Sequence, residues 1–152
     1  MPPRSFRFKL QTVLNYKVEM EEEEQRKLAE ILDRQGKERA VLAGLQSLKA
    51  QKNVELLQKQ GAGKLNVGEI QMYRAHLKQL DVSIVNQEIK LQQIAFELEE
   101  QRKALLAAHQ QVQIYEKLKE KNKEEFDAEI EAEERKLIDE LATIRYDGES
   151  KF

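Results

Sequence analysis

Apolar residues recur at alternating steps of three and four along the second half of this chain. A stripe that begins at Ile70 and ends at Phe126 has seventeen positions, and thirteen of them are apolar. A 3.5-residue repeat held over this length is typical of a coiled coil, because a straight helix of 3.6 residues per turn would carry the stripe out of alignment. The pattern therefore predicts one long helix that packs along a second helix and excludes strands.

Three of the six glycines cluster between the two halves of the chain, at residues 61–68. Just before the stripe, Asn66 and Glu69 have the spacing of a helix-capping box. The prediction is an all-α protein, a long two-helix antiparallel coiled coil that forms a single rod over residues 1–152. Helix one is expected over about residues 8–60, a turn over 61–67 and helix two over about 67–145. In such a hairpin, residue i lies level with about residue 129 minus i.

The first helix is expected to be the weaker one. The sequence EEEEQRK at residues 21–27 interrupts its apolar positions, which include Val54 and Leu57 near the turn. Gly36 and Gly44 each cost about 1 kcal/mol relative to alanine inside a helix. The four consecutive glutamates at 21–24 point around the whole helix, so we expect a solvated face rather than a cation site.

Helix two is longer than helix one, so its last twenty or so residues have no predicted partner within the chain. This C-terminal helical overhang, expected at about residues 126–146, is acidic and keeps an apolar face. An unpaired amphipathic helix end commonly docks into another protein. The candidate partner-binding residues of the overhang are Phe126, Ile130, Leu137, Leu141 and Ile144.

Composition narrows the function further. With 36% charged residues the chain is too polar for a large globular core. The net charge of -2 gives no general attraction to nucleic acid, no apolar run is long enough for direct membrane insertion, and the absence of cysteine fits a cytoplasmic location. Residues 61–64 (GAGK) echo a phosphate loop but lack its spacing, and His76 and His109 are far apart on one helix. We therefore expect no enzyme, no cofactor and no metal.

Three segments together resemble the flagellar export protein family FliJ. The first is Phe6-Arg-Phe-Lys-Leu-Gln-Thr-Val-Leu14, followed by Tyr16-Lys17, and the second runs from Asn66 to Tyr73 and on through Leu77, Leu80-Asp81, Ile84 and Gln87. The third is Tyr115-Glu-Lys-Leu-Lys-Glu-Lys121, with Phe126 and Asp139-Glu-Leu-Ala142 after it. The likeness covers nearly the whole chain, and the order and spacing of the segments carry it.

This resemblance implies a type III export component, a stalk that stands in the ring of the flagellar export ATPase FliI and promotes its assembly and activity. It also implies contact with the export gate protein FlhA, handling of secretion chaperones, and a peripheral location at the inner-membrane export apparatus. The overhang is the part expected to meet the ATPase. The gate contact implied by the family falls near the turn, at Leu45, Leu48, Lys52, His76, Leu80, Ser83 and Gln87. His76 and Lys52 stand where aromatic residues are frequent in the family.

Two interpretations stay open at this level. Gln87 and Gln101 interrupt the stripe, either because they set the pairing of the helices or because packing is looser there. The chain is a FliJ-like export adaptor or another coiled-coil scaffold, such as an injectisome relative or a stalk subunit of a rotary ATPase.

Overall fold

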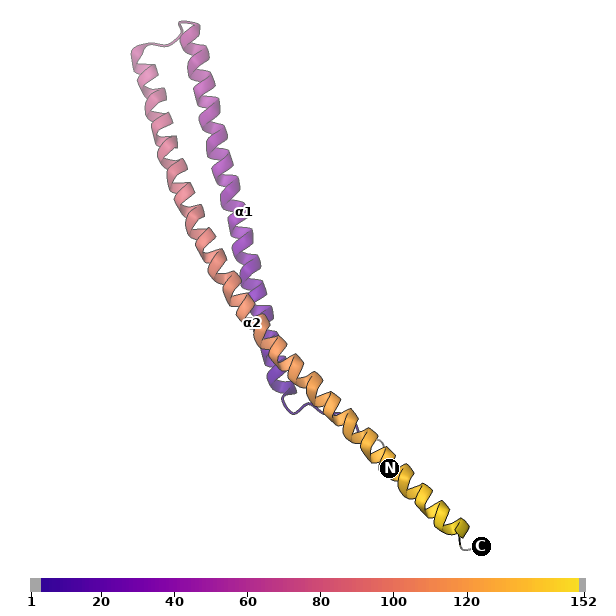
Figure 1. Cartoon of the computed structure of the whole chain (residues 1–152). Coiled ribbons are helices and arrows are strands. Elements are labelled where there is room, and N and C mark those ends of the chain that lie inside the picture. Colours follow the sequence, from indigo (N-terminus) through magenta and orange to yellow (C-terminus); the bar gives the residue numbers. More distant parts are fainter. Residues whose placement is uncertain (1–3, 151–152) are drawn as a thin grey trace. The chain divides into compact units, whose positions relative to one another are not determined.

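The computed structural model describes residues 4–150, and this part of the chain consists of two long helices without a strand. Helix α1 spans Gln11–Gly61 and helix α2 spans Val67–Ser150. They run antiparallel on either side of a short turn (Figure 1). The predicted all-α coiled-coil hairpin is confirmed.

Both sides of the turn are closed by capping hydrogen bonds. At the end of α1, Lys64 N–H donates to the Lys59 carbonyl and Gly63 N–H to the Gln60 carbonyl, both at 3.1 Å. This pair of bonds is the Schellman motif, and it places Gly63 at a φ of 68°, which glycine adopts without strain. At the start of α2, the side-chain oxygen of Asn66 accepts the Glu69 N–H at 2.8 Å. Asn66 is thus the helix cap that the sequence predicts.

Helix α1 begins at Gln11, three residues later than expected. The Phe8 carbonyl accepts the Gln11 N–H at 3.1 Å, and the Phe8 side chain is buried. Phe8 forms a small core with Leu14 and Val112, so the chain before α1 turns its aromatic side chain onto α2 instead of continuing the helix. The remaining side chains packed on this core are Phe6, Val18, Tyr115 and Leu118.

The described residues form two compact units. One unit, Glu23–Leu106, is a helical hairpin with the turn at its end. The other contains the chain up to Glu22 together with the chain from Ala107 onward. The buried apolar residues of the hairpin unit are Leu56, Leu80, Ile94 and Leu98.

We call the row of inward-facing residues on each helix its seam. The α2 seam follows the predicted stripe, but the α1 seam is half polar and differs from the expectation near the turn. Leu56 is buried there, whereas Val54 and Leu57 are exposed. Within the hairpin unit, the buried and half-buried residues of α1 at seam spacing are Glu24, Leu28, Ile31, Gln35, Glu38, Leu42, Leu45, Lys49, Lys52 and Leu56.

Candidate partner-binding surfaces

The two glutamines of the α2 seam form hydrogen bonds to α1. The Gln87 amide nitrogen donates to the Glu38 carbonyl at 2.9 Å and also to the Glu38 carboxylate. The Gln101 amide nitrogen donates to the Glu24 carbonyl at 3.0 Å and also to the Glu24 carboxylate. The sequence left two interpretations of these glutamines open, namely that they set the helix pairing or that they mark looser packing. The structure favours the first.

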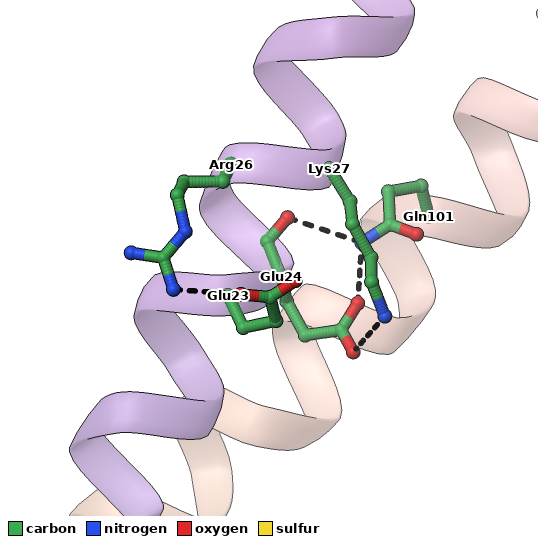
Figure 2. A network of polar contacts seen from close by, with 5 residues as sticks. All are labelled: Glu23, Glu24, Arg26, Lys27 and Gln101. Carbon is green, nitrogen blue, oxygen red and sulfur yellow. Dashed lines mark hydrogen bonds and ion pairs between the residues drawn. The ribbon is translucent and has the colours of Figure 1, made fainter.

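We call these two contacts the Gln–Glu clamps. They are the same arrangement repeated after fourteen residues on each helix, which is two heptads. Figure 2 shows the Gln101 clamp, with the Glu24 carboxylate between the Gln101 amide and the Lys27 ammonium. The neighbouring Glu23 instead turns toward Arg26, and that hydrogen bond lowers the pKa of Glu23.

The Glu38 clamp carries an additional cation from α2. The Lys90 ammonium lies 2.8 Å from the Glu38 carboxylate. The hydrogen bond from Lys90, followed by that from Gln87, lowers the pKa of Glu38. Because both donors come from α2, the ionised carboxylate of Glu38 holds the two helices together.

The predicted pairing of residue i with about 129 minus i is confirmed by contacts between the helices. It puts Lys49 level with residue 80, and the Lys49 ammonium meets the Asp81 carboxylate at 2.5 Å. It puts Arg34 level with residue 95, and the Arg34 guanidinium meets the Glu97 carboxylate. In the other unit it puts Glu21 level with residue 108, and its carboxylate lies 2.7 Å from His109 Nδ1.

The sequence predicts that the glutamates at 21–24 form a solvated face, and this prediction is only partly correct. Glu21 and Glu24 are both half-buried, each within its own unit, and each contacts α2. Their spacing of three residues puts them on the side of α1 that faces α2, while Glu22 and Glu23 are exposed. The four-residue run is thus divided between seam and solvent.

The turn end of the hairpin unit combines cations with an aromatic ring. The Lys59 ammonium donates to the Tyr73 hydroxyl at 2.7 Å, and this bond raises the pKa of Lys59. The Lys59 and Lys52 ammonium groups lie 5.2 and 6.0 Å from the centroid of the Tyr73 ring. A shallow hollow of about 170 Å³ beside this ring is lined by Lys52, Met72, Tyr73 and His76.

The seven residues expected to contact the export gate do not form one outward face. Leu80 is only 6% exposed because it belongs to the seam, and Gln87 is engaged in a clamp. Leu45 and Ser83 are half-buried, whereas Leu48 is 37% exposed. His76 is exposed and shares the turn-end hollow with Lys52. These two residues are therefore the part of the set that a partner can reach together.

The overhang begins later than predicted. The Phe126 ring packs against Phe6, with 5.7 Å between centroids, and Arg4 pairs with Glu133 at 3.3 Å. Ile130 is half-buried. The segment before α1 therefore contacts α2 as far as about residue 133, whereas the predicted pairing left α2 without a partner from about residue 126.

From residue 131 to residue 148, α2 is exposed at every residue whose burial the structure describes. The overhang is therefore limited to residues 131–148, and the name refers to this stretch from here on. Leu137, Leu141 and Ile144 lie in it at the predicted spacing. They are joined by Ile138 and Tyr146, which the sequence reasoning did not include, and the exposed large apolar residues of the overhang are Leu137, Ile138, Leu141, Ile144 and Tyr146.

The sequence reasoning also missed a second apolar row on α2. Val82, Val85, Ile89 and Phe96 are exposed and lie about half a turn around the helix from the seam. We call this row the back face of α2. Its steps of three, four and seven are visible in the sequence, but they are fewer than those of the longer stripe that begins at Ile70.

Among residues 4–150, no group of three or more His, Asp or Glu side chains is placed to hold an ion. No helix in the same range is long and apolar enough to cross a membrane.

Comparison with known proteins gives one family. The family model described as Flagellar FliJ protein matches residues 6–151. No curated protein and no solved structure is significantly similar to the chain.

Proposed function

We propose that this chain, which belongs to the flagellar FliJ family, is an adaptor that docks in the ring of the flagellar export ATPase FliI. Family membership itself indicates a component of flagellar biogenesis and protein export rather than a catalyst. In the proposal, the chain promotes assembly and activity of the ring, links it to the export gate protein FlhA and hands on secretion chaperones, from a peripheral position at the inner membrane.

The observation that carries this proposal is the overhang. Leu137, Leu141 and Ile144 are 57–67% exposed on one continuous helix, although they have the spacing of buried seam residues. Acidic residues dominate around them, at 131, 133, 134, 139 and 140. An amphipathic helix of this kind fits an apolar groove with basic margins in a partner.

The test of the ATPase contact uses a variant that leaves the paired helices intact. We expect Leu137→Ala/Leu141→Ala/Ile144→Ala to reduce binding to the export ATPase and to remove the stimulation of its hydrolysis. The control is Leu57→Ala, which removes an exposed apolar side chain of α1 near the turn. Unchanged binding and unchanged ATPase stimulation with the triple variant would contradict the proposal.

For the gate contact we propose the turn-end hollow. Lys52 of α1 and His76 of α2 lie beside the Tyr73 ring in this hollow, so a partner bound there would contact both helices. We expect Lys52→Ala/His76→Ala to weaken binding to the cytoplasmic domain of FlhA, measured by calorimetry. Glu99→Ala, which is on α2 far from the turn, is the control. Equal affinities of the double variant, the control and the parent would refute this assignment.

A further inference from the structure

The back face of α2 is free of charge in an otherwise highly charged chain. Val82, Val85, Ile89 and Phe96 are 48–68% exposed. The polar residues between them on the same side of the helix are the uncharged Asn86, Gln92 and Gln93. The chain as a whole has 36% charged residues, so a charge-free row of this length indicates a surface that meets another apolar surface.

One end of the back face is hollowed. Lys78, Asp81, Val82 and Val85, with Asn86, line a shallow hollow of about 250 Å³. The first four have the spacing i, i+3, i+4 and i+7, which is the arrangement that receives a side chain from a facing helix. Asp81 is held at the edge of this hollow by its ion pair with Lys49.

The other end of the back face carries an exposed aromatic ring. Phe96 is 68% exposed and lies fourteen residues after Val82, on the same side of α2. The back face thus has a hollow at one end, an aromatic side chain at the other and Ile89 midway. When a second copy is rotated by half a turn, its aromatic side chain lies opposite the hollow of the first. Such self-complementarity is the mark of an interface with two-fold symmetry.

We infer that the back face binds the back face of a second copy of this chain, with the two α2 helices antiparallel and the two-fold axis near Ile89. Phe96 of each copy then fills the hollow beside Val82 of the other, and the two Ile89 side chains meet on the axis.

Charge supports the antiparallel orientation. Beyond Val82 and Phe96, Lys78 and Glu100 continue the line of the back face, whereas Asp81 at the edge of the hollow is paired with Lys49. Antiparallel pairing about Ile89 brings Lys78 of one copy to Glu100 of the other, and does so twice by symmetry. Parallel pairing would place Lys78 against Lys78 and Glu100 against Glu100, which is unfavourable. Within its own helix Glu100 has only a long contact, 3.4 Å, to Lys103.

The interface is small, which sets the expected strength of the dimer. Fifteen residues of helix extend about 22 Å, so the pairing is expected to be reversible and dependent on concentration rather than permanent.

The experiment is sedimentation velocity of the full chain over a wide concentration range, with circular dichroism to confirm that each variant is folded.

We expect the mean mass of the parent protein to rise toward that of a dimer with concentration. Ile89→Glu should weaken self-association at least about tenfold, because two carboxylates would meet on the axis. Met72→Glu, an exposed apolar residue of the same helix on a different side, should leave it unchanged. A parent that stays monomeric at every concentration, or an Ile89→Glu variant that associates as the parent does, would overturn the inference.

The orientation has its own test by charge exchange. Lys78→Glu and Glu100→Lys should each weaken the dimer, and the double variant Lys78→Glu/Glu100→Lys should restore it, because opposite charges again face each other. Association that is lost in both single variants and not restored in the double variant would overturn the antiparallel arrangement.

Discussion

Two stretches of α2 have the same apolar spacing and opposite environments. In the hairpin unit, Ile94 and Leu98 are 3% and 6% exposed. In the overhang, Leu137 and Leu141 are both 57% exposed. The comparison shows that a repeat of three and four specifies an apolar face on a helix, whereas burial depends on whether another segment lies against that face.

The two helices of the hairpin unit also differ from each other. The seam of α2 is mainly apolar, whereas that of α1 includes Gln35, Glu38, Lys49 and Lys52. Apolar contact alone therefore does not hold this pair. Hydrogen bonds and ion pairs from α1 to α2, such as the Gln–Glu clamps, determine which residues face each other.

The largest predicted effect separates the buried stretch of α2 from the overhang. Leu98→Ala should lower the free energy of unfolding by about 2–5 kcal/mol, because it leaves a cavity at a buried site. Leu141→Ala should change it by less than about 0.5 kcal/mol, because the side chain is already in water. Urea unfolding followed by circular dichroism measures both, and similar losses in the two variants would show that the overhang is paired in solution.

The fold was predictable because the chain repeats one local rule many times. The stripe from Ile70, the glycine cluster and the Asn66 cap point to the same hairpin, and the pairing contacts lie within a few residues of the predicted positions. Periodicity on helix one was less informative, since polar residues fill half of its seam. The prediction that Val54 and Leu57 belong to the apolar side of this helix is wrong for this reason, and Leu56 is buried there instead.

The candidate surfaces were harder to predict, for two physical reasons. A segment outside the helices, Arg4 to Phe8, covers Phe126 and so moves the start of the overhang, and no helical repeat reports on such a segment. A family resemblance also names contact residues without indicating which side of the helix each one occupies. Leu80 and Gln87 are seam residues, as the stripe from Ile70 predicts, and are therefore turned toward α1, while Lys52 and His76 share an accessible hollow.

The next effect tests the clamps as part of the paired stretch. Gln101→Ala should lower the free energy of unfolding by about 1 kcal/mol, because the half-buried Glu24 carbonyl and carboxylate lose a donor from α2. Gln79→Ala removes an exposed amide from the same helix and is the matched control. Equal unfolding midpoints for the two variants would mean that the clamps contribute nothing to the pairing.

A smaller effect of opposite sign is expected on α1. An added Cβ at Gly44 meets no atom within 4 Å, so Gly44→Ala should stabilise the helix by about 0.5–1 kcal/mol. Gly63→Ala should instead be destabilising, although it too has open space, because the φ of 68° at the helix end is unfavourable for alanine. Thermal unfolding of both variants tests whether α1 is limited by its own helix propensity.

The smallest effect is electrostatic and belongs to the Glu38 clamp. Lys90, and after it Gln87, lowers the pKa of Glu38 in the folded protein below its usual value near 4.3. A carboxyl whose pKa is depressed by folding stabilises the folded state at pH values above its unfolded pKa. That contribution is lost as the pH falls from the unfolded pKa through the folded one. The stability difference between the parent and Glu38→Gln should therefore be constant near neutral pH and shrink in acid. Carbon-detected NMR titration of the Glu38 carboxyl gives the direct measurement, and a midpoint at or above about 4.3 would show that the Lys90 contact does not persist in solution.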